Sequence, residues 1–383
     1  MKKDTAIAAI VLAAGLSERM GRFKPLLPLG ACRTIERVVT IFQTAGIEEI
    51  IVVTGHRGAD VRQVMAPLNV RCIENPNYLE GMFSSVLTGI QALPARCRKV
   101  FIHPVDIPLV RSHTVRRLVT AFKKSSASIL YPTFDGRRGH PTLIHACLAP
   151  LILEWPGLGG LRAFLKCHDA DSLELPVADE AILLDLDTPQ DYHRMLDRLT
   201  FEGLPTENEC RVLMEVIQCL PPDIKAHCRA VAVVAQRLAE ALNAAGIFID
   251  GELVHTAALL HDIARTRKDH AEAGAQLLET HGFNRLSPIV RAHMDLNGPA
   301  GQPIDETQVV YLADKLVAGD QRVDLEKRFA RKLEKYGLDP FAVSQIARRR
   351  ENARRIQAEV ERLTGLAIDT IVGAAGPLDE KKR

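Results

Sequence analysis

Residues 11–24 constrain this chain most, because an apolar run passes directly into a turn that holds two glycines and basic residues. The segment reads Val-Leu-Ala-Ala-Gly-Leu-Ser-Glu-Arg-Met-Gly-Arg-Phe-Lys. Gly15 and Gly21 let backbone N–H groups approach an anion closely, and Arg19 and Lys24 neutralise its charge. Neither the G-x-x-x-x-G-K-[ST] spacing nor the G-x-G-x-x-G spacing is present. The segment predicts a strand and a polyphosphate-binding loop; the alternative is a plain strand-to-helix turn.

Length and composition narrow the class of protein. A chain of 383 residues exceeds one ordinary hydrophobic core, so we expect two domains. With 49 Lys and Arg against 47 Asp and Glu, general binding to nucleic acid or to a membrane surface is not expected. The eight cysteines form no C-x-x-C pair, which is typical of reduced thiols in the cytoplasm. No signal peptide and no apolar run of about 20 residues is present, so we expect a soluble cytoplasmic protein.

The apolar pattern changes near residue 200. Before it, short apolar runs alternate with helical patterns, which predicts a doubly wound, mostly parallel α/β sheet. Strands are expected at 9–12, 49–54, 71–74, 99–103, 128–132 and 181–185, and helices at 34–45, 58–65, 82–93, 112–123 and 189–199. After it, an apolar period near 3.6 predicts an all-helical domain. The expected domains are therefore 1–200 and 210–365, with a linker at 201–209 and a flexible tail at 366–383.

The loop resembles a known family signature. Residues 12–24 match L-A-A-G-x-S-x-R-M-G-x-x-K, the signature of the MobA/MocA-like nucleotidyltransferases, at every defined position. The resemblance implies a Rossmann-like fold of the nucleotide-diphospho-sugar transferase type and transfer of a nucleotidyl group from an NTP. It implies that Arg19 and Lys24 are catalytic, and that the nucleotide contacts these two residues and Leu12, Ala13, Ala14 and Gly15.

Aspartates follow two of the expected strands, where open α/β sheets bind their ligands. Asp106 is expected to bind Mg²⁺, which prefers carboxylate oxygens; the alternative is a helix cap. It resembles the catalytic metal-binding aspartate of the family's G-D-x-P segment, although Val105 replaces the glycine. A second stretch resembles the family's D-x-D-T-P-x-D element and offers Asp185 and Asp187, of which Asp187 is favoured as the second ligand. Asp191 fits an ordinary acid in a first helical turn.

Two further segments resemble family elements. Residues 75–85 match N-P-x-x-x-x-G-M-x-S-S, which lies against the nucleotide base in related transferases. This implies nucleotide binding by Gly81, Ser84 and Ser85 at a helix N-terminus. Residues 136–141 match G-x-x-G-H-P, which implies an anionic acceptor held by Arg137, Arg138 and His140; the alternative is a surface turn.

Base and acceptor follow from the resemblance alone. Within the family, L-A-A-G accompanies cytidylyl transfer and L-A-G-G accompanies guanylyl transfer, and this chain has Ala13 and Ala14. The resemblance implies CTP as donor and molybdopterin as acceptor, with molybdoenzyme maturation factors as further partners. The alternative keeps the fold and takes a sugar phosphate or alditol phosphate as acceptor.

Histidines and aspartates recur in the helical half. His227, the His261-Asp262 pair and Asp314 lie among apolar residues at helical spacings. Burying an unpaired imidazole or carboxylate costs free energy, so these side chains need a metal ion or one another. Their order resembles that of the HD-domain metal-dependent phosphohydrolases. The resemblance implies that all four bind metal, that Asp262 also accepts a proton, and that a phosphoester or phosphoanhydride is hydrolysed; the alternative is a set of mutually satisfied core residues.

His270 and His293 extend this pattern. Both fall where HD subfamilies with two metals carry extra histidines. A binuclear site would favour iron or manganese. Arg265 stands where many of these hydrolases carry Lys, which keeps the charge but changes the geometry. The alternative function is a catalytically silent module that senses metal or nucleotide and regulates the transferase.

Overall fold

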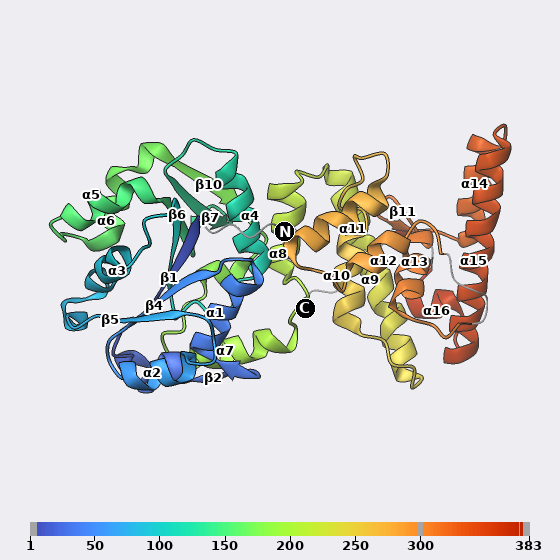
Figure 1. The fold of residues 1–383 in the computed structure, drawn as a ribbon. Coiled ribbons are helices and arrows are strands. Elements are labelled where there is room, and N and C mark those ends of the chain that lie inside the picture. Colours follow the sequence, from blue (N-terminus) through green and yellow to red (C-terminus); the bar gives the residue numbers. More distant parts are fainter. Residues whose placement is uncertain (1–5, 297–301, 375, 378–383) are drawn as a thin grey trace. The chain divides into compact units, whose positions relative to one another are not determined.

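The computed structural model describes residues 6–296, 302–374 and 376–377. The chain divides into two compact units, residues 1–202 (unit 1) and residues 203–383 (unit 2), which Figure 1 shows as an α/β part and a helical part. Across the described ranges, no helix combines the length and the apolar character needed to cross a lipid bilayer.

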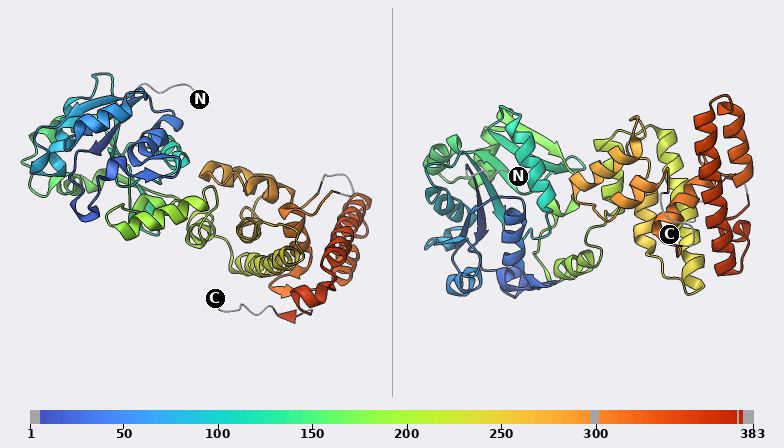
Figure 2. Two further views of the ribbon diagram at one scale, coloured as in Figure 1. Left: turned by 90° about the horizontal axis from the view of Figure 1, so that it is seen from below. Right: turned by 45° about the vertical axis from the view of Figure 1, so that its right-hand side comes forward.

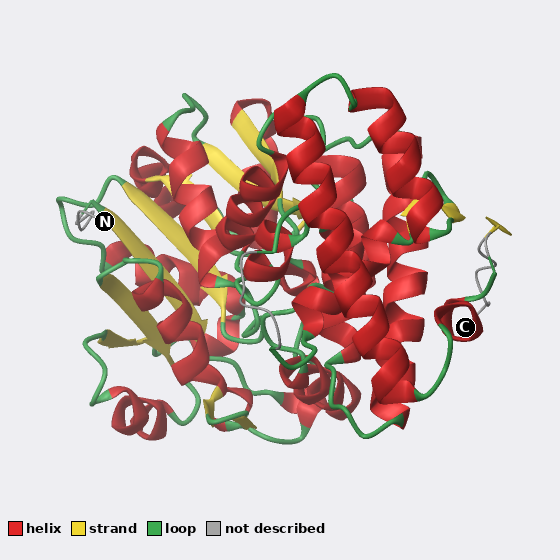
Figure 3. Cartoon of the chain, turned by 90° about the vertical axis from the view of Figure 1, so that its right-hand side faces the viewer, coloured by secondary structure: helices red, strands yellow, loops and turns green. Residues whose placement is uncertain are grey.

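Unit 1 is built on one mixed sheet. Its strand order is β10-β7-β9-β6-β1-β4-β5, with β8 paired to β7. All neighbours along this order are parallel except that β9 runs antiparallel to β6 and β7. The strands are β1 Ile7–Ala13, β4 Glu49–Thr54, β5 Arg71–Glu74, β6 Lys99–Pro104, β7 Ile129–Phe134, β8 Arg137–Arg138, β9 Thr142–His145 and β10 Ser172–Pro176, and β2 Pro28–Leu29 and β3 Cys32–Arg33 form a separate hairpin. The expected doubly wound, mostly parallel sheet is confirmed (Figure 3).

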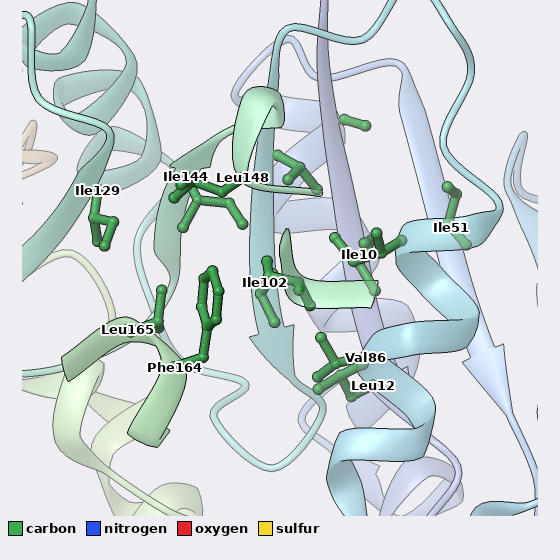
Figure 4. Packing of buried hydrophobic residues seen from close by; sticks show 14 of the residues in the cluster. Ile10, Leu12, Ile51, Val86, Ile102, Ile129, Ile144, Leu148, Phe164 and Leu165 are labelled. Carbon is green, nitrogen blue, oxygen red and sulfur yellow. The ribbon is translucent and has the colours of Figure 1, made fainter. Parts of the chain in front are cut away.

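Helices cover both faces of this sheet, which is why β1 is apolar at every position. On one face, Ile10 and Leu12 of β1 pack with Val86 of α3, as Figure 4 shows, and α5 and α6 complete that layer. On the other face, Phe42 of α1 lies 5.5 Å from Phe101 of β6, measured between ring centroids. The helices are α1 Thr34–Thr44, α2 Gly58–Met65, α3 Met82–Gln91, α4 Ser112–Lys123, α5 Ala149–Glu154, α6 Gly160–Cys167 and α7 Pro189–Thr200, with 3₁₀ turns η1 Glu18–Met20, η2 Lys24–Leu26, η3 Tyr78–Glu80, η4 Ala146–Leu148, η5 Asp169–Asp171 and η6 Glu180–Leu183.

One edge of the sheet differs from the prediction. The strand expected at 181–185 is wrong, because this stretch forms η6, in which the Leu184 N–H donates to the Ala181 carbonyl. The strand beside β7 is β10 instead. A short apolar run fits a turn packed on the core as well as a strand, so periodicity did not separate them. The elements β8, β9, β10, α5 and α6 were not expected, and each spans eight residues or fewer.

Unit 2 is helical, as expected for this half of the chain (Figure 3). Helix α9 contacts α10, α13, α15 and α16, and α14 packs along α15, as Figure 2 shows. The helices are α8 Glu207–Val212, α9 Pro222–Ala244, α10 Gly251–Leu260, α11 His270–His281, α12 Ser287–Ala292, α13 Glu306–Lys315, α14 Leu325–Tyr336, α15 Pro340–Thr364 and α16 Ile368–Val372, with a π-helical turn η7 Leu213–Ile217. A small sheet joins β11 Val317–Ala318, β12 Gln321–Arg322 and β13 Gly376–Pro377.

Parts of the expected linker and tail are ordered structure. Helix α8 begins inside the expected linker, where Thr206 and Glu209 form a capping box. Helix α16 lies inside the expected flexible tail, and Val372 is fully buried there. Arg237 donates to the Val372 carbonyl at 2.7 Å, which attaches α16 to α9. The expected flexibility is therefore wrong for 368–372; residues 375 and 378–383 lie outside the described residues.

Gly89 on α3 lies against β1, and this generates a stability prediction. A methyl group at Gly89 would lie 2.5 Å from Ile10 Cγ2 and 3.2 Å from Val53 Cγ2. We expect Gly89→Ala to lower the free energy of unfolding by about 1–3 kcal/mol through overpacking, although Ala favours helix. Urea unfolding followed by circular dichroism measures this, with Gln91→Ala at an exposed position of the same helix as the control. Equal stability of the two variants would contradict the close packing of α3 on β1.

Candidate active sites

The loop after β1 folds back toward the sheet. Ser17 and Gly21 adopt left-handed backbone conformations, with φ of 61° and 65°. Ser17 Oγ accepts a hydrogen bond from the backbone N–H of Lys24 at 3.0 Å. This turn brings the Lys24 side chain, 11% exposed, into the unit, whereas Arg19 stays 76% exposed. No atom of the described part of the chain would lie within 4 Å of a methyl group at Gly15, so the loop is open on that side.

Two aspartates meet Lys24 at the carboxyl end of the sheet. The Lys24 ammonium lies 2.6 Å from Asp187 Oδ1 and 3.6 Å from Asp106 Oδ2, and Arg19 lies 2.9 Å from Asp187 Oδ2. Asp106 follows β6 by two residues, and its carbonyl accepts from the Leu186 N–H at 2.7 Å. The structure therefore brings together four residues that the sequence placed in one site: Arg19, Lys24, Asp106 and Asp187.

Electrostatics at this edge favour a bound cation. Burial raises the pKa of Asp106; Lys24 opposes this effect and Asp187 adds to it. Burial, Asp106 and Asp187 also raise the pKa of Asp185. Crowded carboxylates of this kind are relieved by positive charge, and their oxygens are the ligands that Mg²⁺ prefers. The residues present fit a magnesium ion.

The helix-cap alternative for Asp106 is wrong. Helix α4 begins after Arg111, and its N-terminal groups are bound by Asp179. Asp179 Oδ2 accepts from the Arg111 N–H at 2.8 Å and from Thr114 Oγ1 at 2.6 Å. Asp191 forms a capping box with Thr188 at the start of α7, which confirms its expected local role.

A cavity of about 400 Å³ lies beneath the loop. Its lining includes Leu12, Ala14, Gly15, Arg19, Lys24, Gly81, Ser85 and Asp106 from the expected site, together with Tyr78, Leu79 and Met82. Ala13 is buried and does not line it. Ser84 does not line it either, because its hydroxyl donates to the carbonyls of Asn77 and Gly81. The cavity therefore joins the phosphate loop to the start of α3.

Asn75 organises this side of the cavity, and sequence reasoning gave it no role. It is 2% exposed, and its amide donates to Ser84 Oγ at 2.9 Å and Ser85 Oγ at 3.0 Å. Its backbone N–H donates to the Thr54 carbonyl at 2.8 Å. The available signal was an Asn before Pro at the end of a strand.

The expected acceptor loop is occupied by internal contacts. Arg138 pairs with Asp169 at 2.5 Å and Glu174 at 2.7 Å, and its guanidinium lies over the Tyr131 ring. Desolvation lowers the pKa of the half-buried His140 to about 4, so the ring is neutral at neutral pH. Among the expected acceptor residues, Arg138 forms ion pairs within unit 1, and the backbone N–H of His140 donates to the Ile182 carbonyl. Arg137 is exposed. None of the three lines the cavity beneath the loop.

The histidines and aspartates of unit 2 converge from separate helices. His227 lies on α9, His261 and Asp262 follow α10, His270 begins α11, His293 follows α12 and Asp314 lies on α13. Asp262 Oδ1 lies 3.4 Å from Nε2 of both His270 and His293. Asp262 Oδ2 lies 3.6 Å from His261 Nε2 and 4.0 Å from His227 Nε2. Asp314 Oδ1 lies 3.3 Å from His227 Nε2.

Backbone carbonyls orient three of the rings. Nδ1 of His227 is 2.9 Å from the Gly319 carbonyl, Nδ1 of His261 is 2.7 Å from the Ala258 carbonyl, and Nδ1 of His293 is 2.6 Å from the Val290 carbonyl. A proton on Nδ1 donates to the carbonyl and leaves the Nε2 lone pair facing the cluster, as in metal-binding histidines. Burial lowers the pKa of His261 to about 4, which keeps that ring neutral.

Unpartnered polar atoms at the centre fit metal binding. Nε2 of His261, Nε2 of His293 and Oδ1 of Asp262 are buried and have no hydrogen-bond partner among the described residues. The sets His227-His261-Asp262 and Asp262-His270-His293 each place their ligand atoms within 4.8 Å of one another. The alternative of mutually satisfied core residues fails on these atoms. Asp262 belongs to both sets.

Comparison with known proteins finds a family match in each unit. Residues 9–173 match the MobA-like NTP transferase domain, and residues 224–319 match the HD domain. The molybdenum cofactor cytidylyltransferase of Escherichia coli is 30% identical over 198 residues, which is 51% of this chain and 98% of that protein. The chain belongs to the MobA-like NTP transferase family. It is a nucleotidyltransferase of that family that also carries an HD domain.

Other relatives cover smaller parts or share less sequence. The bifunctional IPC transferase and DIPP synthase of Rubrobacter xylanophilus is 39% identical over 119 residues, 30% of this chain and 26% of that protein. A nucleotidyl transferase from Methanothermobacter thermautotroptrophicus superposes with a TM-score of 0.46 at 25% identity, covering 52% of this chain and 99% of that chain.

The two ligand sets of the HD domain generate a prediction of metal content. We expect the protein, loaded with Mn²⁺ and dialysed, to retain two ions per chain, because two sets share Asp262. His293→Ala is expected to retain about one ion and Asp262→Ala fewer than one. Mass spectrometry of the dissolved metal measures this, with His255→Ala on α10 as the control. A single ion in the unchanged protein would contradict a binuclear centre, and full content in Asp262→Ala would show that the site lies elsewhere.

Proposed function

We propose that unit 1 transfers a cytidylyl group from CTP to molybdopterin and releases pyrophosphate, and that unit 2 hydrolyses a phosphate ester. The observation that carries the first proposal is the meeting of Lys24 with Asp106 and Asp187, because Lys24 and Asp106 line the cavity beneath the loop. Lys24 offers positive charge to the triphosphate, and the neighbouring Asp106 and Asp187 offer carboxylates to a divalent ion. Phosphoryl transfer depends mainly on such positioning and charge stabilisation.

The transfer requires charge neutralisation and alignment. A phosphate oxygen of the acceptor attacks the α-phosphorus of CTP; the new P–O bond forms as the bond to the pyrophosphate breaks. Lys24 and Arg19 exchange their pairing with Asp187 for the triphosphate oxygens. Asp106 and Asp187 would hold Mg²⁺, which when bound neutralises phosphate charge and orients the leaving group.

CTP is favoured over GTP by the residues at the end of β1. The pair Ala13-Ala14 follows the L-A-A-G pattern, and the Escherichia coli relative that spans unit 1 is named a cytidylyltransferase. The proposal of molybdopterin as the acceptor is supported by the same Escherichia coli relative. A sugar phosphate or alditol phosphate is the second candidate acceptor, supported by the 39% identity to the Rubrobacter xylanophilus transferase.

For unit 2 we propose metal-dependent hydrolysis, in which water adds to phosphorus and the ester oxygen leaves as an alcohol with the proton. The cluster of His227, His261, Asp262 and Asp314, extended by His270 and His293, would hold iron or manganese. Such ions when bound activate water and polarise the phosphoryl oxygen. Asp262 would orient the water and accept its proton. If purified protein holds no transition metal, a regulatory sensing role replaces hydrolysis.

The donor and acceptor are tested by pyrophosphate release. With Mg²⁺ and molybdopterin, we expect release with CTP and little with GTP, ATP or UTP, measured side by side by an enzyme-coupled assay. Equal release with GTP would contradict the role given to Ala13 and Ala14. Silence with all four nucleotides, followed by release with CTP and an alditol phosphate, would replace the acceptor and leave the transferase function intact.

The separation of the two chemistries is tested at Asp106. We expect Asp106→Asn to lower pyrophosphate release by at least about 100-fold, the size of a lost charge-stabilising group, and to leave phosphate ester hydrolysis unchanged. Asp197→Asn, at an exposed position of α7, is the matched control. Loss of both activities in a folded Asp106→Asn protein would contradict separate metal sites.

A further inference from the structure

The HD cluster opens into a cavity of about 700 Å³ that carries a large excess of basic side chains. Eight basic residues line it: Arg265, Lys315, Arg322, Lys327, Arg328, Arg331, Lys332 and Arg349. The acidic lining residues are Asp223, Asp262, Asp314 and Asp324, and two of these belong to the metal cluster. A cavity with this balance attracts anions of high charge.

Most of these cations already have a carboxylate partner. The pairs are Lys315 with Asp314 at 2.5 Å, Arg322 with Asp369 at 2.5 Å, Arg349 with Asp295 at 2.6 Å, Arg328 with Asp314 at 3.4 Å and Arg265 with Asp262 at 3.7 Å. Three do not: within the described ranges, Lys327, Arg331 and Lys332 make no ion pair with an acid. We call these three side chains the α14 wall, because all of them project from α14 into the cavity lining.

Lys332 shows the effect of this crowding. It is half-buried, and burial, followed by the charges of Arg328 and Lys315, lowers its pKa to about 8. A bound anion would relieve the mutual repulsion of these cations. The wall therefore has unused capacity for negative charge beside the metal cluster.

The same cavity lacks the large aromatic side chains on which bases commonly stack. Among the described residues that line it there is no Phe, Tyr or Trp, the side chains on which bases stack. Its apolar lining is limited to small or aliphatic side chains such as Ile224, Met294 and Val317. The prominent feature of this cavity for selecting a ligand is therefore its charge.

We propose that the α14 wall binds phosphate groups that are not themselves hydrolysed, so that the substrate of unit 2 is a polyphosphorylated compound selected by its number of phosphates and not by its base. This inference rests on the proposed hydrolase function. Helix α14 lies outside the HD-domain match at residues 224–319, so the family match does not assign a role to the wall.

Hydrolysis by the full chain tests the selectivity. The protein carries Asp106→Asn, so that unit 1 does not consume nucleotide, and is loaded with Mn²⁺. We expect kcat/KM for ester hydrolysis, followed as release of the nucleoside, to rise at least about tenfold from the mono- to the triphosphates of adenosine and cytidine, and to differ little between the two bases. Arg331→Ala/Lys332→Ala is expected to raise KM for the triphosphates about tenfold with kcat little changed. Preference for monophosphates, or for one base, would overturn the proposal.

Binding without turnover tests the wall independently. The probe is inorganic tripolyphosphate, titrated calorimetrically into metal-free full-length protein carrying Arg19→Ala and Lys24→Ala, which removes the loop cations of unit 1. We expect Arg331→Ala/Lys332→Ala to weaken its Kd at least about tenfold, and Lys335→Ala, on the same helix but outside the cavity lining, to leave it unchanged.

The two experiments separate the two proposals. Wall-dependent binding with no hydrolysis of any phosphate ester would overturn the hydrolase function and support the wall. Hydrolysis of monophosphates with wall-independent binding of tripolyphosphate would do the reverse. Circular dichroism of the double variant checks that unit 2 remains folded.

Discussion

The buried carboxylate of Asp262 is the constraint on which the arrangement of unit 2 depends. Its side chain is 7% exposed, and a carboxylate in such a place costs free energy unless positive charge or hydrogen-bond donors surround it. Helices α9, α11 and α12 each bring one histidine to within 4.0 Å of it, and α13 adds Asp314 to the same cluster. The same residues that stabilise the packing of these four helices around Asp262 therefore also form the candidate metal site.

Unit 1 meets a similar constraint in a different way. Asp106 and Asp187 both pair with the Lys24 ammonium, and the exposed Arg19 side chain also pairs with Asp187. Charge at this site is balanced within the protein. In the proposed transfer, Lys24 and Arg19 turn to the triphosphate, so Asp106 and Asp187 would need a divalent cation in their place. The Leu186 N–H bond to the Asp106 carbonyl keeps the two acidic segments together whichever partner Lys24 has.

Sequence patterns predicted the residues of both sites better than their surroundings. The loop at 12–24 carries its residues at short spacings, and the segment around Asp106 and the His, His-Asp, Asp order resemble known families, so Lys24, Asp106 and Asp262 could be named in advance. Arg138 could not be judged in the same way, because its partners Asp169 and Glu174 are more than thirty residues distant along the chain. The run at 181–185 failed because apolar composition alone does not separate a strand from a 3₁₀ turn.

The α14 wall could not be predicted from local sequence patterns. Helical periodicity around Arg331 indicates an exposed basic face, which on most proteins is simply solvated. Only tertiary packing shows that this face borders the cavity of the metal cluster, where Lys315 and Arg328 already bind Asp314. The cavities of the two units differ in the side chains that line them. The cavity of unit 1 is lined by Tyr78 and the exposed Met82, whereas that of unit 2 is lined by eight basic side chains and no Phe, Tyr or Trp among the described residues. This difference is the physical basis on which we propose recognition of a base by unit 1 and recognition of phosphate groups by unit 2.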